Sequence, residues 1–123
     1  MSRNPEKLDV FRLADELVIE LYQATRTFPI EERYGLSAQL RRAAVSTASN
    51  IVEGCARRST AEYLHFLNIA AGSAFEARYL TDASFRLGYL KHTQYEALMP
   101  QQTRLAKSII RLIASLEPST PKA

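Results

Sequence analysis

The sequence predicts an all-α protein, an up-down-up-down antiparallel four-helix bundle, and three observations support this fold class. Apolar residues recur at helical spacing in four long segments of the 123-residue chain. Short links carrying capping patterns, Gly or Pro separate these segments. The composition, with only 4 Gly and 5 Pro, favours helix over sheet. We therefore expect one domain over residues 1–123, with an ordered core of about 8–116 and a polar, disordered tail at 117–123.

The first helix is expected over residues 8–27 and should end at Phe28-Pro29, since Pro disfavours helical geometry in the residue before it. Its apolar stripe is wider than a single core requires. Such width is typical of a helix buried on two sides, which indicates that copies of the chain associate. The alternative is that the extra residues are scattered surface hydrophobes, which are common. These extra apolar residues are Val10, Leu13, Ile19 and Tyr22.

The second helix should begin with Ser37 as its N-cap and continue to Arg58. Cys55, the single cysteine, lies on its apolar stripe. No intrachain disulfide is therefore available, which favours a cytoplasmic location. We interpret Cys55 as a small buried hydrophobe rather than a reactive thiol.

Capping patterns predict where the last two helices begin. Ser59-Thr-Ala-Glu62 is a capping box that should start the third helix, and Gly88 should end it. Thr93-Gln-Tyr-Glu96 is a second capping box, from which the last helix should run to about residue 116. Pro100 falls inside this helix and should kink or loosen its first turns.

Polar or small residues form a narrow stripe on each of the two middle helices. If the hairpin turns at Ser59, residues equally distant from it along the chain lie at the same height. We hypothesise that the two stripes face each other as a polar ladder, with an ionic rung between Arg42 and Glu76; the alternative is that both stripes are solvated. The expected rungs are Gln39 with Tyr79, Arg42 with Glu76, Ser46 with Gly72, Asn50 with Asn68, and Glu53 with His65.

Basic residues suggest a partner for the chain. A net charge of +3 and a pI near 9.2 permit binding to nucleic acid or another polyanion. We expect five cations to position phosphates, with Tyr89 and Tyr95 available to stack on bases. The alternative is ordinary solvated faces and helix caps. The five are Arg57 and Arg58 at the end of the second helix and Arg104, Lys107 and Arg111 on one face of the last.

No catalytic, cofactor or membrane pattern stands out. A Ser-His-Asp set, a Gly-rich phosphate loop and a Cys-x-x-Cys pair are all missing. Glu62-Tyr-Leu-His65 has the Glu-x-x-His spacing of di-iron bundles, but such sites need the motif twice plus two further Glu. We expect no metal, no cofactor and no enzymatic activity. We also expect a soluble, cytoplasmic protein, because charged residues interrupt every apolar run and no signal peptide is present.

A set of residues through the middle of the chain carries a resemblance to a known family. The set is Phe28-Pro29, Glu32, Tyr34-Gly-Leu36, Gln39-Leu-Arg-Arg-Ala-Ala44, Ser46, Ser49-Asn-Ile51, Glu53-Gly54, Arg58-Ser59, Glu62, Phe66-Leu67, Ile69-Ala70, Gly72-Ser73 and Glu76. From Leu8 to Leu116 the chain resembles the four-helix-bundle family encoded within 23S rRNA intervening sequences.

The resemblance implies a homopentameric ring. The family is also similar to the accessory variability protein of diversity-generating retroelements, which implies binding to structured RNA or a protein–RNA complex and association with a reverse transcriptase. We therefore expect a homo-oligomer that binds RNA or DNA, with a reverse transcriptase or another protein as a candidate partner. The alternative is a protein-interaction scaffold with no direct nucleic-acid contact.

Overall fold

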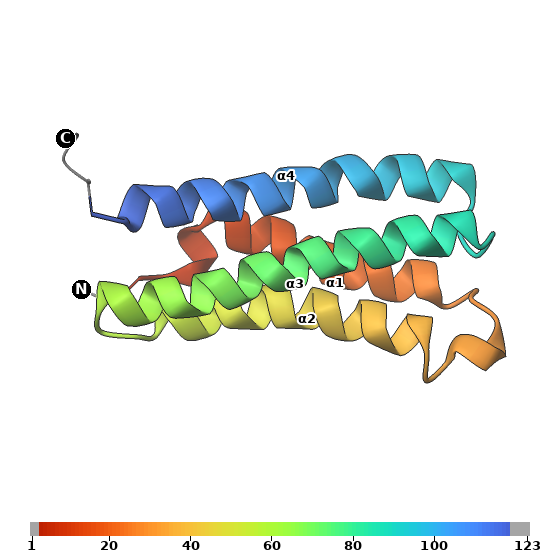
Figure 1. The fold of residues 1–123 in the computed structure, drawn as a ribbon, viewed down its shortest axis with the longest axis horizontal. Helices are drawn as coiled ribbons and strands as arrows, with labels where there is room; N and C mark the ends of the chain where they lie inside the picture. Colours follow the sequence, from red (N-terminus) through yellow and green to blue (C-terminus); the bar gives the residue numbers. More distant parts are fainter. Residues whose placement is uncertain (1–2, 119–123) are drawn as a thin grey trace, which may run out of the picture.

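The computed structural model describes residues 3–118, which form four long helices that run antiparallel, side by side (Figure 1). The helices are α1 (Asp9–Thr25), α2 (Leu36–Cys55), α3 (Thr60–Arg86) and α4 (His92–Leu116). Short 3-10 helices, η1 (Pro5–Lys7) and η2 (Ile30–Glu32), precede α1 and α2. The predicted all-α class is confirmed, and no strand occurs within the described range. Of the tail predicted to be disordered, residues 119–123 lie outside the described residues.

Each helix packs against two neighbours around a shared core. α1 contacts α2 and α4, and α3 contacts the same two helices, with the α2–α3 pair in the most extensive contact. All four helices contribute side chains to the centre of the bundle, and these side chains are almost fully buried. They are Leu21, Leu40, Ile51, Leu67 and Ile109. Burying one such side chain stabilises the fold by about 1.5–3 kcal/mol. Cys55, 4% exposed, belongs to this core as predicted.

The widened stripe of α1 divides into two groups. Val10 and Leu13 are buried within the chain's own core, so the expectation that they lie outside a single core is wrong. Ile19 and Tyr22 remain 56% and 39% exposed. Of these four residues, only Ile19 and Tyr22 therefore offer apolar surface to a partner.

The ends of α3 follow the sequence prediction. The Ser59 hydroxyl accepts a hydrogen bond from the Glu62 backbone N–H at 3.1 Å, which caps the first turn. Gly88 follows the last turn with φ 83°, a left-handed conformation that L side chains rarely adopt.

The starts of α2 and α4 differ from the prediction. α2 begins at Leu36, whose N–H donates to the Glu32 carboxylate at 3.0 Å, so Glu32 replaces Ser37 as the capping side chain. α4 begins at His92, one residue before the predicted box, and the Gln94 side-chain oxygen accepts from the Lys91 N–H at 2.9 Å. In both cases a side chain other than the predicted one accepts a hydrogen bond from a backbone N–H at the start of the helix. Helix α4 continues through Pro100 to Leu116.

Candidate nucleic-acid interface

Three of the five predicted cations lie together on the exposed side of α4. Arg104, Lys107 and Arg111 are exposed, whereas Leu105 and Ile109 of the same helix are buried in the core. None of the three has an ion-pair partner among residues 3–118. We call these three residues the α4 basic face.

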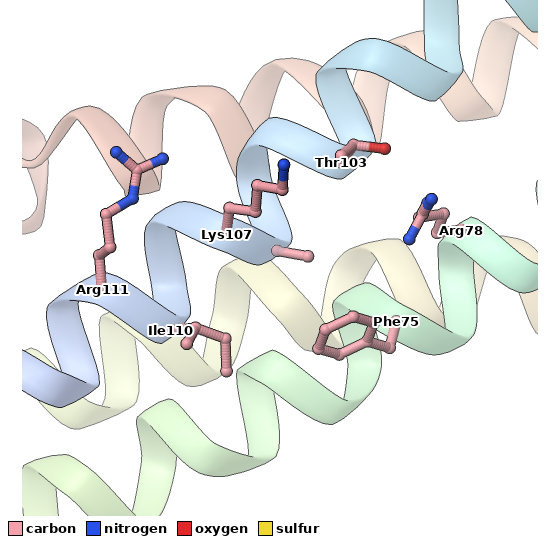
Figure 2. Close-up of a pocket in the computed structure, with 7 residues that line it drawn as sticks. Phe75, Arg78, Thr103, Lys107, Ile110 and Arg111 are labelled. Atoms are coloured by element: carbon pink, nitrogen blue, oxygen red, sulfur yellow. The ribbon is translucent and has the colours of Figure 1, made fainter.

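A groove between α3 and α4 runs beside this basic face. Its hollow has a volume of about 490 Å³, and Phe75 and Ile110 along it are 49% and 46% exposed. Figure 2 shows Lys107 and Arg111 on α4 and Arg78 on α3, with the two apolar side chains between the helices. The α3–α4 groove, as we call it, is lined by Phe75, Arg78, Thr103, Ala106, Lys107, Ile110 and Arg111.

A second hollow continues the α3–α4 groove toward the start of α4. Phe75 and Arg78 line both hollows, and Tyr79, which is 62% exposed, lines the second. The groove thus combines an apolar, partly aromatic floor with positive charge along its rim. Such a surface suits a ligand that carries both negative charge and flat apolar groups.

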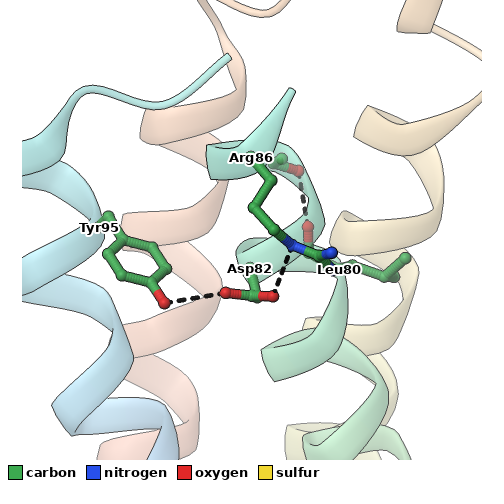
Figure 3. Close-up of polar contacts among 5 residues, drawn as sticks. Leu80, Asp82, Arg86 and Tyr95 are labelled. Atoms are coloured by element: carbon green, nitrogen blue, oxygen red, sulfur yellow. Dashed lines mark hydrogen bonds and ion pairs between the residues drawn. The ribbon is translucent and has the colours of Figure 1, made fainter. Parts of the chain in front are cut away.

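The structure does not leave Tyr89 and Tyr95 free to stack on bases. The Tyr95 hydroxyl donates to Asp82 at 2.9 Å (Figure 3). The Tyr95 ring stacks on Phe85 with ring centroids 4.1 Å apart. The Tyr89 hydroxyl donates to Glu32 at 3.0 Å. These hydrogen bonds to carboxylates are the main reason that the pKa of each tyrosine is raised. The exposed aromatic rings along the α3–α4 groove are Phe75, which lines the hollow with Lys107 and Arg111, and Tyr79, which lines the second hollow.

Arg57 and Arg58 lie in the turn between α2 and α3. This turn is at the same end of the bundle as the last residues of α4 (Figure 1). Arg57 forms an ion pair with Glu53, and its guanidinium lies 4.9 Å from the Phe66 ring centroid. Arg58 is exposed and has no ion pair within the part of the chain described. Three of the five predicted cations thus share one face of α4 and two lie in the α2–α3 turn, and Arg78 lines the groove beside those on α4.

Other basic side chains near the site are already paired or neighboured by acids. Arg86 donates to Asp82 at 2.9 Å, in the network drawn in Figure 3. Arg104 lines a hollow between α1 and α4 together with Asp9 and Glu16. No acidic residue lines the α3–α4 groove beside Lys107 and Arg111 in the described part of the chain.

The side chains of the predicted polar ladder form different pairings from those expected. The Ser46 hydroxyl lies 2.8 Å from that of Ser73 rather than opposite Gly72. Gly72 itself is exposed. Arg42 and Glu76 are both exposed and form no ion pair in the described chain.

The remaining ladder residues bond within their own helix or face outward. Glu53 pairs with Arg57, Asn50 donates to the Ser46 carbonyl at 2.8 Å, and Asn68 donates to the Leu64 carbonyl at 2.9 Å. Gln39, His65 and Tyr79 are exposed. The expected rungs between the two stripes are therefore not formed among residues 3–118.

Residues 3–118 contain neither a cluster suited to a metal ion nor a helix suited to a membrane. Glu62 and His65 are exposed on α3, and no cluster of three or more His, Cys, Asp or Glu side chains suited to a metal ion occurs in residues 3–118. Among those same residues, no helix has the length and apolar character needed to cross a bilayer.

Fold and site together define a class: an all-α protein of four antiparallel helices whose last helix presents unpaired positive charge. Residues 6–111 match the family model described as 23S rRNA-intervening sequence protein, and the chain belongs to that family. The predicted family membership is thereby confirmed. A search of curated proteins gave no significant match.

A solved structure shares the fold. The chain is similar to a protein with unknown function from the S23 ribosomal protein family of Bacteroides thetaiotaomicron. The two are 26% identical with a TM-score of 0.76, over 85% of this chain and 97% of that chain.

Proposed function

We propose that this protein is a non-enzymatic, homo-oligomeric, cytoplasmic bundle that binds nucleic acid through the α4 basic face and the α3–α4 groove. The ligand is structured RNA or an RNA–protein complex. The observation that carries the proposal is the set of three exposed cations on one face of α4, unpaired among residues 3–118 and next to exposed aromatic rings.

The spacing of these cations suits a phosphate backbone. Arg104 and Arg111 are seven positions apart, which is about 10 Å along a helix at 1.5 Å per residue. That length spans about three phosphates of a duplex strand at 3.4 Å per step. The cations position the backbone without reading bases. Phe75 and Tyr79 offer faces on which unpaired bases stack.

Two further observations support the ligand class and the assembly. The family is associated with 23S rRNA intervening sequences, which makes RNA the first ligand to test. Apolar side chains left exposed on the single chain, such as Ile19 and Val45, support self-association. The pentameric ring implied by the family resemblance is the stoichiometry we expect, and it would repeat the basic face around the assembly.

The test is binding of a fluorescently labelled RNA hairpin, followed by anisotropy at low salt. Arg111→Glu should weaken binding by tenfold or more, because it replaces a phosphate contact with a repulsive charge. Arg33→Glu makes the same change of charge at an exposed site in the α1–α2 connection and should leave the affinity within about twofold. Equal losses in the two variants, or no binding of RNA or DNA by the wild type, would contradict the proposal.

A protein-interaction scaffold is the second candidate, and the exposed floor of the α3–α4 groove favours it. Phe75 and Ile110 expose apolar surface of the kind that receives a partner's side chains. Phe75→Ala separates the two functions, because it removes the ring without adding a charge. It should leave RNA affinity unchanged if the groove serves a protein, such as a reverse transcriptase, and weaken it if the ring stacks on bases.

A further inference from the structure

A hollow at the end of the bundle where α1 joins α2 is lined by three arginines. This end lies opposite the last residues of α4 (Figure 1). The three are Arg26, Arg33 and Arg41, and none of them forms an ion pair among residues 3–118. No acidic residue of the described chain lines the same space, which we name the α1–α2 hollow. Its positive charge is therefore not neutralised from within.

Arg41 is held in place at one side of the α1–α2 hollow. Its Nε donates to the Thr25 hydroxyl at 2.8 Å, and a terminal nitrogen donates to the Tyr22 carbonyl at 3.1 Å. The guanidinium also lies 4.5 Å from the Tyr22 ring centroid. These bonds leave some of its five N–H donors free, and an already ordered side chain loses little entropy when it binds an anion. Contacts with the end of α1 thus explain Arg41 but leave Arg26 and Arg33 unexplained.

Ser37 adds a buried hydroxyl without a partner. It lines the α1–α2 hollow and is only 7% exposed. Glu32 caps α2 in its place, and the Ser37 hydroxyl forms no hydrogen bond with any of residues 3–118. Ser37 and Arg41 are four residues apart on α2, so their side chains are neighbours on one face. Because buried polar groups normally have partners, this hydroxyl points to a ligand in the hollow.

The lining of the α1–α2 hollow indicates the chemistry of that ligand. Guanidinium groups match the oxygens of a phosphate, and a phosphate monoester carries about −1.5 to −2 charge at pH 7. Phe28 and Ile30 line the same space and supply an apolar wall. The hollow has a volume of about 370 Å³, within the range of about 300–1,000 Å³ typical of small-molecule sites. A fitting ligand therefore carries one terminal phosphate and a small apolar or flat group.

We propose that the α1–α2 hollow binds a small phosphate monoester, of the class of a nucleoside monophosphate, through its three arginines and the Ser37 hydroxyl. This site is separate from the α4 basic face and does not depend on the proposed function. The hollow has room for one small molecule, so an RNA hairpin stem should bind elsewhere. Substitutions of Arg33 therefore remain controls for RNA binding.

Isothermal titration calorimetry with adenosine monophosphate as the probe tests the ligand class. The wild type should bind it, inorganic phosphate should compete with it, and adenosine should bind at least tenfold more weakly because it lacks the phosphate. Excess RNA hairpin should leave the nucleotide bound. Equal affinity for adenosine, or no binding of either adenosine monophosphate or inorganic phosphate, would overturn the proposal. Displacement by the hairpin would also overturn it, since the hollow would then belong to the RNA interface.

Three variants test the assignment of the residues. Arg26→Gln should weaken nucleotide binding by tenfold or more, because it removes a charged contact with the phosphate. Arg58→Gln removes the same charge from an exposed position at the other end of the bundle and should leave the affinity within about twofold. Ser37→Ala keeps the net charge, removes one donor and should weaken binding by roughly threefold to tenfold.

The same variants separate this site from the RNA interface and from a loss of fold. Arg26→Gln should bind the RNA hairpin like the wild type, and thermal melts followed by circular dichroism should show that all three variants remain folded. Equal losses of nucleotide affinity in Arg26→Gln and Arg58→Gln would indicate a general attraction between charges and overturn the proposal. Wild-type nucleotide affinity in folded Ser37→Ala and Arg26→Gln would overturn it as well.

Discussion

Tyr63 is a buried tyrosine between Cys55 and the side chain of Arg3. Tyr63 is 2% exposed and lies beside Cys55, and the Arg3 guanidinium lies 4.3 Å from its ring centroid. Burial, and then the neighbouring Cys55, raise the pKa of Tyr63 to about 12. The neutral hydroxyl is therefore the form that the folded state accommodates.

This raised pKa predicts a loss of stability in alkali. The unfolded chain releases the Tyr63 proton near pH 10, whereas the folded chain holds it to about pH 12, so the contribution is complete below pH 10 and lost between these values. We expect the free energy of unfolding in urea to fall by about 1–2 kcal/mol across this window. Tyr63→Phe should flatten the decline only in part, since Tyr89 and Tyr95 also have raised pKa values. An identical decline in this variant would contradict the assignment to Tyr63.

Gln102 and Thr81 form a buried polar pair between α3 and α4, and removing either side chain should have a different cost. The Gln102 amide donates to the Thr81 hydroxyl at 3.0 Å, both residues are 2% exposed or less, and the amide oxygen has no partner. Thr81→Val leaves the amide without its acceptor and should destabilise the protein by about 1–3 kcal/mol. Gln102→Met removes an unsatisfied oxygen and should cost under about 1 kcal/mol. Thermal unfolding of both variants checks the order, and a larger loss for Gln102→Met would contradict it.

Two positions that depend only on nearby residues, Ser59 and Gly88, were predicted correctly. Ser59 bonds a residue three positions away, and Gly88 ends α3 through its own backbone conformation. Tyr89 was assigned a role in base stacking, yet its hydroxyl bonds Glu32, 57 residues earlier in the chain. Helical periodicity holds no information about which loop residue reaches such a tyrosine.

At the scale of elements, Glu32 holds the α1–α2 connection against the α3–α4 connection. One carboxylate oxygen accepts from the Leu36 N–H and the other from the Tyr89 hydroxyl, both at 3.0 Å. A Cβ atom at Gly35 would lie 2.6 Å from the Glu32 carboxylate, so Gly35 gives that side chain its room. A single acid thus starts α2 and links it to the turn that follows α3.

Glu32→Ala should therefore destabilise the bundle by about 1–3 kcal/mol, since it leaves a helix N-terminus and a tyrosine hydroxyl without acceptors. Tyr89→Phe should cost less, and the double variant should cost less than the sum because the two side chains share one hydrogen bond. Glu31→Ala, at an exposed neighbouring position, is the control and should change stability by under about 0.5 kcal/mol. Urea denaturation measures all four variants, and strictly additive losses would contradict the link.

The polar ladder could be predicted from helical spacing only in part. Helical spacing grouped Arg42, Ser46 and Glu53 on one stripe correctly, but the pairing assumed a hairpin centred on Ser59. In the structure Ser46 contacts Ser73, and Arg42 and Glu76 form no ion pair among residues 3–118. Which side chains meet across the hairpin depends on local packing, such as the close approach at Gly54, which spacing does not encode.

For the whole molecule, the four helices, their order and their antiparallel arrangement could be predicted because apolar periodicity and short connections determine them. The candidate site was predicted in part. Arg104, Lys107 and Arg111 were grouped from their spacing on one helix. Arg78 and Phe75 join them only because α3 packs beside α4, and that packing brings together residues about thirty positions apart.

The salt dependence of RNA binding tests the proposed nucleic-acid interface. Each phosphate that the protein contacts releases counterions, so the salt dependence reports the number of phosphates contacted. The logarithm of the association constant should fall linearly with the logarithm of salt concentration, with a slope near −0.9 for each duplex phosphate contacted. Lys107→Ala should make this slope shallower by about one unit for each copy that touches the RNA. Arg33→Ala removes the same charge at the far end of the bundle and should leave the slope unchanged. Because the two variants have equal net charge, a general electrostatic attraction would change both slopes alike, whereas contact through the α4 basic face changes only the first.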